Sequence, residues 1–326
     1  MRLINFKTAA FVAMTTLLTA CGGGDSGLDK KSAKELFQEA SQHFYAPNAQ
    51  YNFSSVAKIY TTVDNPFTDE LKLKINGAID NKAMRYEVRP EVEAGMINVK
   101  LPMLIDIKKQ EVMIDPANVV DTIGMFTPDA ARDLAKYKGK HVRFSLKNFD
   151  VNAKDLEAAM TIISETTKIA VGALNEFNAH IPESSIKKLD LDSKAKELNA
   201  KAKIRVDLDA EQSKELQRKV NAYFIAEVQR NEHFPADFKR GFNDAMLEND
   251  LMDSGIENTS SVMYLNDKGQ VIHSQDTYNF SVENDSVSMT MTTDYSNYGK
   301  PEFKVAPKAA DIVEFTQQDV AKIRGF

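Results

Sequence analysis

Histidines and acidic residues could carry acid–base or metal chemistry, but their spacing in this sequence favours neither. The five histidines are scattered one to a segment, at His43, His141, His180, His233 and His273. None has the HExxH or comparable spacing that metal sites use, so isolated histidines are the better interpretation. The pairs Asp190/Asp192 and Asp207/Asp209 would each point one way from a strand end, as a calcium site or a glycosidase requires. Because no partner pair or glycine-containing loop accompanies them, we interpret them as solvated strand ends.

Motifs for nucleotide or acyl chemistry are also missing from the sequence. It contains no G-x-S-x-G elbow and no phosphate loop. We therefore predict no catalytic residue, no metal and no cofactor. A hydrolase with a site assembled from distant residues is retained as the third hypothesis.

Cys21, the one cysteine, has the clearest chemistry. Arg2 and Lys7 precede an uncharged, apolar-rich stretch, residues 8–20. This stretch is too short to span a membrane comfortably. The stretch ends in Leu18-Thr19-Ala20-Cys21, which resembles the lipobox of bacterial lipoproteins. The resemblance implies that residues 1–20 are a cleaved signal peptide. It also implies a diacylglycerol on the Cys21 thiol and an acyl chain, such as palmitate, on the new amino terminus. Two or more acyl chains would anchor the protein stably to a membrane.

The residues after Cys21 predict a tether and a location. Gly22-Gly23-Gly24-Asp25-Ser26-Gly27 is typical of a flexible chain, and we expect a tether over 21–31. In the lipoprotein family an aspartate directly after the cysteine often retains the protein at the inner membrane. Gly22 takes that place here, so the resemblance implies the outer membrane of the cell envelope, with the protein facing the periplasm.

Composition limits the classes of partner. The chain has a net charge of −6, and loss of Arg2 and Lys7 would make it more acidic, so no nucleic acid is expected. Hydrophobic residues make up 43% of the chain, enough for a substantial core. With Cys21 acylated, no cysteine remains for a disulfide or a thiolate metal site.

Hydrophobic periodicity predicts an α+β fold with a curved antiparallel sheet, covered by helices and with an enlarged helical middle. Apolar side chains at helical spacing predict helices over 32–45, 153–179, 210–231, 235–251 and 316–324. Thr127-Pro128, a cap followed by proline, predicts the start of another helix. Alternation predicts strands over 51–63, 71–79, 84–89, 97–101, 103–107, 111–114, 185–192, 200–208, 259–265, 270–282 and 286–295. We expect one domain over 32–326. Two related units, 32–150 and 180–326, are the alternative.

Three stretches resemble the half-barrel lipid carriers of the LolA/LolB group and the LppX-like lipoproteins. They are Tyr51-Asn52-Phe53, the run from Leu73 to Asp80, and Tyr295 to Pro307, which resembles the last sheet strand of that group. The resemblance implies a strongly bent sheet that encloses acyl chains. The chain departs from it in length, because its helical middle is larger than such carriers need.

On this resemblance, inward-facing sheet residues become candidate walls of a ligand cavity. The candidates are Phe53, Ile59, Leu71, Leu73, Ile75, Met84 and Tyr86. Methionines also recur, at Met84, Met96, Met103, Met113, Met125, Met289 and Met291, and suit either variable acyl chains or gap-filling in a core. The leading hypothesis is a non-catalytic, membrane-anchored protein that binds a lipid or another hydrophobic ligand. The alternative is a structural or assembly lipoprotein that docks a protein partner of the envelope.

Overall fold

The computed structural model describes residues 27–44, 46–61, 71–95, 97–127, 132, 134–145, 148, 153–248, 256–282, 285–316 and 319. The lipobox lies outside these residues. The chain divides into two compact units: unit 1 is Met1–Ala46 with Glu157–Thr290, and unit 2 is Pro47–Leu156 with Met291–Phe326. Each unit is therefore built from two distant parts of the sequence. The single domain over 32–326, and its alternative of two related units, stay predictions.

The fold is mixed α/β with a large open sheet, which confirms the coarse prediction of the fold class. In unit 2 the hydrogen-bonded strand order is β13-β7-β6-β5-β3-β2-β1-β12, and β4 pairs with β3. In unit 1 the order is β12-β11-β10-β9-β8. β12 (Asp285–Ser296) contributes its first part to unit 1 and its second part to unit 2.

Unit 2 is a meander of alternating strands, as the sequence predicted. Its strands are β1 (Gln50–Thr61), β2 (Leu71–Asp80), β3 (Arg85–Ala94), β4 (Ile97–Lys100), β5 (Met103–Asp106), β6 (Glu111–Ile114), β7 (His141–Ser145) and β13 (Ile312–Phe315). β1–β2, β2–β3, β3–β5, β5–β6 and β6–β7 pair antiparallel, whereas β13 pairs with β7 in parallel. The helix α3 (Ala117–Phe126) packs against β4.

Local chemistry explains where β3 begins and how it changes partner. The Asp80 carboxylate accepts a hydrogen bond from the Ala83 backbone N–H (2.8 Å), which closes the turn after β2. Met84 ends that turn with a φ of 56°. Further along, Pro90 lies between the residues that pair with β5 (85–88) and those that pair with β4 (91–94). A proline has no N–H to donate, so it fits this gap in the ladder.

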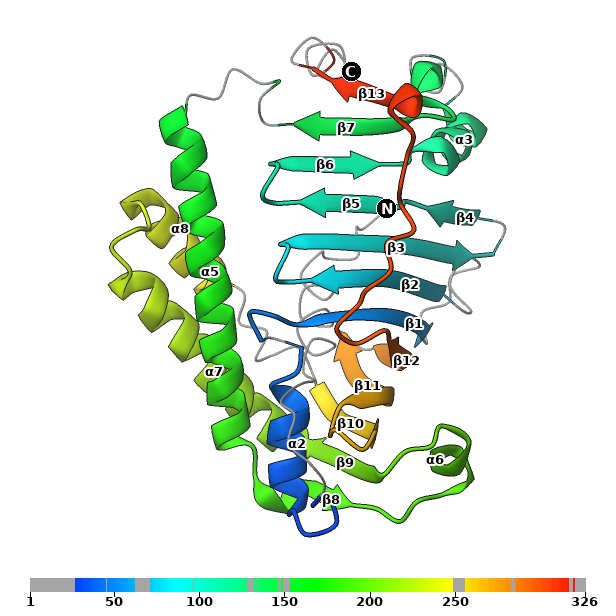
Figure 1. Cartoon of the computed structure of the whole chain (residues 1–326). Coiled ribbons are helices and arrows are strands. Elements are labelled where there is room, and N and C mark those ends of the chain that lie inside the picture. The colour runs from blue at the N-terminus through cyan, green and yellow to red at the C-terminus, as the bar shows by residue number, and fades with distance from the viewer. Residues whose placement is uncertain are drawn as a thin grey trace. The chain divides into compact units, whose positions relative to one another are not determined.

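Unit 1 packs helices against the other strands. Its elements are α2 (Ala33–Ser41), α5 (Ala153–His180, entering the unit at Glu157), β8 (Ile186–Lys188), α6 (Ser193–Glu197), β9 (Ala202–Asp209), α7 (Ala210–Arg230), α8 (Ala236–Glu248), β10 (Ile256–Leu265) and β11 (Val271–Val282). α2 packs against β8 and β9, and α7 packs against β9 and β10 (Figure 1). Capping boxes start α2, with Ser32 and Glu35, and α7, with Asp209 and Gln212.

The helical layer of unit 1 is closely packed. Leu36, Phe37 and Ala40 of α2 are buried. α5 and α7 approach each other at Gly172, where an added Cβ would lie 1.9 Å from the Tyr223 hydroxyl oxygen. This position therefore admits only glycine unless the tyrosine moves.

Several predicted elements are corrected. The strand expected over 185–192 covers only 186–188, because the following residues lead into α6, which begins after its N-cap Asp192. The short strands β7 and β13 were not predicted, although β4, β5 and β6, which are equally short, were. The expected helices at Thr127-Pro128 and 316–324 lie mostly outside the described residues.

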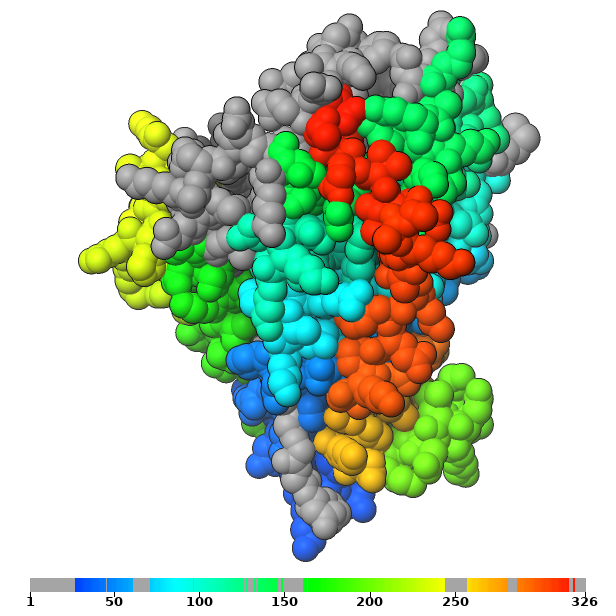
Figure 2. Space-filling model, turned by 45° about the horizontal axis from the view of Figure 1, so that its top comes forward, coloured from blue at the N-terminus to red at the C-terminus, as the bar shows by residue number. Residues whose placement is uncertain are grey.

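The stretch from Tyr295 to Pro307 is not a last sheet strand. β12 ends at Ser296, and residues 297–308 contain no strand. This carboxyl-terminal segment, defined as residues 297–311, crosses the strands of unit 2 toward β13 (Figure 1). Figure 2 shows it, orange to red, at the surface beside the cyan and green residues of unit 2. Its prolines and its φ-positive Asn297 and Gly299 suit an irregular crossing rather than a ladder.

Candidate functional site

The apolar face of unit 2 is the candidate site. Cross-strand partners share a face, so the pairing registers define this face across six neighbouring strands. Its residues are Tyr51, Phe53, Ser55, Ala57 and Ile59 of β1; Leu71, Leu73, Ile75, Gly77 and Ile79 of β2; Tyr86, Val88, Pro90, Val92 and Ala94 of β3; Met103 and Ile105 of β5; Val112 and Ile114 of β6; and Val142 and Phe144 of β7. None of these residues carries a charge.

Burial distinguishes this face from an ordinary core. Except for the buried Gly77, the residues that β2, β3, β5 and β6 place on it are half-buried. The other buried residues lie at its edges, at Tyr51, Ser55 and Ala57 of β1 and at Val142 of β7, where Tyr137 and Phe315 pack. Five strand spacings of about 4.8 Å make the face roughly 24 Å wide. It is therefore long, apolar and only partly covered.

The predicted cavity residues mostly meet on this face. Phe53, Ile59, Leu71, Leu73, Ile75 and Tyr86 all belong to it. Met84 differs, because it lies in the turn before β3 rather than in the strand. That these residues line a ligand cavity stays a prediction.

Gly77 shapes the face between β1 and β2. It pairs directly with Phe53, and an added Cβ would lie 2.5 Å from Phe53 Cε1 and 2.4 Å from the Glu87 carbonyl oxygen. Without a Cβ, Gly77 thus leaves room for the Phe53 ring against the backbone of β2. Sequence alternation alone did not single out this position.

The opposite side of the same strands, the charged face, carries an ion-pair ladder. Lys74 pairs with Glu93 and lies 3.8 Å from Glu91, while Lys100 Nζ lies 2.9 Å from Glu91 Oε1. Hydrogen bonds from Asn98 and Lys100 lower the pKa of Glu91 to about 2. Because these groups are half-buried or exposed, each pair adds little stability. The ladder keeps this side polar and soluble.

The carboxyl-terminal segment is fastened to the charged face through Asn52. The Asn52 amide donates to the Glu302 carbonyl (2.8 Å) and accepts from the Glu302 N–H (2.8 Å) and from the Asn297 side chain (3.1 Å). The Arg85 guanidinium lies 4.4 Å from the centre of the Phe303 ring. The segment thus contacts the polar side of β1 and β3, and its Tyr298 ring also lies 5.9 Å from the ring of Tyr51, which pairs with Ile79 of the apolar face.

Glu87 also fastens the carboxyl-terminal segment. Its side chain is fully buried, and its Oε2 accepts a hydrogen bond from the Val305 N–H at 2.6 Å. Arg89 Nε lies 3.0 Å from Oε1 but without hydrogen-bond geometry. A buried carboxylate with one charged neighbour and one N–H donor is stable only while the segment stays in place.

The methionines do not gather on one face. Met103 lies on the apolar face. Met113 pairs with Leu104, so it lies on the charged face. Met125 is 74% exposed on α3, and Met289 and Met291 are buried in β12. Met96 lies outside the described residues. For Met289 and Met291, burial fits the gap-filling interpretation.

The acid pairs have structural roles. Asp192 and Asp209 cap α6 and α7, and Asp192 also pairs with Lys203 at 2.7 Å. Asp207 accepts hydrogen bonds from Ser260 and Arg205. Within the described ranges, no group of three His, Cys, Asp or Glu side chains is placed to hold a metal ion.

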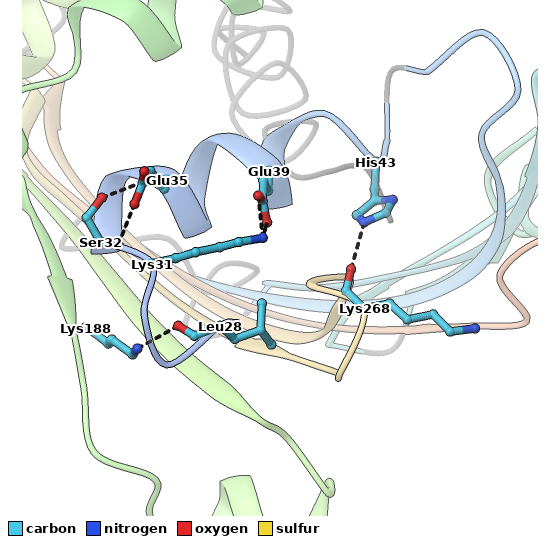
Figure 3. A network of polar contacts seen from close by, with 8 residues as sticks. All are labelled: Leu28, Lys31, Ser32, Glu35, Glu39, His43, Lys188 and Lys268. Carbon is cyan, nitrogen blue, oxygen red and sulfur yellow. Dashed lines mark hydrogen bonds and ion pairs between the residues drawn. The ribbon is translucent and has the colours of Figure 1, made fainter. Parts of the chain in front are cut away.

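The first described residues are fastened to unit 1. Lys188 Nζ donates to the backbone carbonyls of Leu28 (2.8 Å) and Asp29 (3.0 Å), and the Leu28 side chain is buried. Lys31 pairs with Glu39, and His43 Nε2 lies 3.4 Å from the Lys268 carbonyl oxygen (Figure 3). The last part of the expected tether, residues 27–31, is thus held in turns. The rest of the expected tether, residues 21–26, lies outside the described residues.

Comparison with known proteins adds no relative. No family model matches the chain, and no curated protein matches it. In the part of the chain that the structure describes, no helix is long and apolar enough to cross a membrane.

Proposed function

We propose that the protein is a lipid-anchored envelope protein that binds the acyl chain of a lipid on the apolar face of unit 2. The observation that carries this proposal is the continuous uncharged surface that six neighbouring strands present, whose residues on β2, β3, β5 and β6 are half-buried apart from Gly77. Binding would involve no covalent chemistry, and no catalytic residue, metal or cofactor is assigned.

The size and chemistry of the face support a long hydrocarbon chain as its ligand. A face about 24 Å wide matches an extended chain better than a compact molecule. Affinity would come from apolar area removed from water, at about 25 cal/mol for each Å². The half-barrel geometry of LolA- and LppX-like carriers, the lipidation of Cys21 and the outer-membrane location facing the periplasm all belong to this proposal.

Native mass spectrometry of protein made in a bacterial envelope tests the ligand. The chain would carry its full mature sequence, residues 21–326, with Cys21→Ser so that no attached lipid confuses the mass. We expect a bound mass that extracts into organic solvent and identifies as a lipid. A clean apo mass, unchanged when phospholipid or fatty acid is offered, would contradict the proposal and favour docking of a protein partner.

Two matched double variants of β2 locate the ligand. Leu73→Asn with Ile75→Asn places polar groups on the apolar face, and Lys72→Asn with Lys74→Asn changes the charged face of the same strand. The first pair should remove the bound lipid and the second should retain it. Equal loss from both would point to a folding defect rather than to the apolar face.

Anchoring is tested separately. Cys21→Ala should abolish acylation of the full precursor and release the protein from the membrane fraction. A variant that remains bound after washing would overturn the lipobox assignment without affecting the lipid-binding test.

A further inference from the structure

Asp276 is an acidic residue buried in the sheet of unit 1. It lies on β11, and its side chain is 8% exposed. Its Oδ1 accepts a hydrogen bond from Ser261 of β10 (2.5 Å), which is its direct cross-strand partner. Its Oδ2 accepts one from Ser274 (3.0 Å). Two hydroxyl groups, rather than a cation, therefore satisfy this carboxylate.

The layer around Asp276 is apolar. The register places Ser261 opposite Val206 of β9, so the buried residues of β9 and β10 share a side with Asp276. α7 packs against these two strands. The buried side chains that these elements contribute are Ile204, Val206, Leu208, Ser213, Leu216, Val220 and Met263. None of them is charged.

Two other titratable groups lie near Asp276 on its own strand. Tyr278 is buried on the same side of β11, and a tyrosine is neutral at physiological pH. His273 is buried on the opposite side, where its ring contacts Tyr264. Its charge lowers the pKa of Asp276 less than the two serine hydrogen bonds do.

Burial dominates the balance at this carboxyl group. It raises the pKa of Asp276 to about 6, against opposing effects of Ser261, Ser274 and His273. In the closed layer the carboxyl group therefore keeps its proton up to a pH of about 6. In an opened, hydrated layer it loses this proton at a lower pH. Closure of the layer is favoured in acid, and part of that preference is lost as the pH rises through 6.

We propose that Asp276 is a pH-sensitive latch, which tightens the layer of β9, β10, β11 and α7 in acid and loosens it near neutral pH. The latch belongs to unit 1 and does not depend on lipid binding by the apolar face of unit 2. It gives that layer a conformational response in the range where ordinary carboxylates no longer titrate.

His43 acts with the opposite sign in the same unit. Burial lowers its pKa to about 4, so acid favours the opened form in which this histidine is protonated. His43 contacts the Lys268 carbonyl in the turn between β10 and β11. A test of Asp276 must therefore separate the two groups.

Hydrogen exchange of amides in β9–β11 and α7 tests the latch, with rates corrected for the intrinsic effect of pH. The proteins would be the mature chain with Cys21→Ser, its Asp276→Asn variant and Asp267→Asn, which removes an exposed carboxylate from the same hairpin. With the carboxyl pKa at about 6 when closed and 3.8 when open, Asp276 by itself should make local opening about tenfold rarer near pH 5 than near pH 7.5, and His43 opposes this component. Because His43 is present in all three proteins, the difference between variants isolates Asp276.

Asp276→Asn should lose this tenfold component, and Asp267→Asn should keep it. The same pH dependence in the parent protein and in Asp276→Asn would overturn the proposal. If Asp276→Asn does not fold, His43→Gln serves instead, because it removes the opposing group and leaves Asp276 in place. Exchange protection in His43→Gln must then increase from pH 7.5 to pH 5, and a flat profile would overturn the proposal.

Discussion

The sheet faces of the two units are built from the same alternation but are covered differently. In unit 1, the inward residues Ala202, Ile204, Val206 and Leu208 of β9 are 0–7% exposed. In unit 2, Leu71, Leu73 and Ile75 of β2 have the same alternation and are only half-buried. A period of two determines which side chains share a face, but it does not determine what covers that face. The difference suggests that β9 serves as core and that β2 is available for a ligand.

The largest expected effect separates these two faces. Ile204→Ala should lower the free energy of unfolding by about 2–5 kcal/mol, because the site is closed and cannot relax. Leu73→Ala should cost about half as much, since its side chain is already partly exposed. Urea denaturation of both variants measures the ratio. Equal losses would show that the two faces are equally closed.

Gly77→Ala should have the next effect, at about 3 kcal/mol. Its Cβ would lie 2.4 Å from the Glu87 carbonyl oxygen, a backbone atom that cannot turn away, and would displace the Phe53 ring. Gly241→Ala in α8 is the control, because nothing lies within 4 Å of its Cβ and alanine favours a helix. Thermal unfolding should move down for Gly77→Ala and slightly up for Gly241→Ala. A stable Gly77→Ala protein would contradict the close approach of β1 and β2.

Glu87→Ala should cost about 2 kcal/mol and loosen the carboxyl-terminal segment. It leaves the Val305 N–H without its acceptor in a buried place. Limited proteolysis should then cut within 297–308. Glu302→Ala is the control, because that residue contacts Asn52 through its backbone. Unchanged cleavage in Glu87→Ala would rule out the fastening role of this carboxylate.

Lys74→Gln should have the smallest effect, below about 1 kcal/mol. The ion pairs of Lys74 lie on the charged face, partly open to water, where such pairs add little. Chemical denaturation with and without added salt checks this expectation. A loss above about 2 kcal/mol would mean that the charged face is as important to folding as the apolar one.

Local alternation made much of unit 2 predictable. β1 and β2 begin and end within about two residues of their expected positions, because each has enough residues to show the period, whereas β3 continues to Ala94 instead of ending at 89. Six of the seven proposed cavity residues also share the apolar face, since their spacing fixes their side of the strand. The prediction for Met84 was wrong, because hydrophobicity does not distinguish a turn residue with positive φ from a strand residue.

Other features depend on contacts between distant residues. Glu87 has the pattern of an outward-facing charge, and its burial comes from Val305, 218 residues later in the chain. The parallel pair of β7 and β13 likewise joins two short strands from the two separate parts of the sequence that make up unit 2. Asp276 is one of the buried polar residues of β11, together with His273 and Ser274. Alternation could show that it faces inward but not that two serines satisfy it.

Photo-crosslinking with a fatty acid that carries a photoreactive group along its chain tests the central claim most directly. The mature chain with Cys21→Ser would be irradiated with this probe, digested and examined by mass spectrometry. We expect adducts on the apolar face, at residues such as Leu73, Val92 and Ile105, and we expect unlabelled lipid to compete with the probe. Adducts spread equally over the charged face, or none that unlabelled lipid displaces, would contradict lipid binding by unit 2.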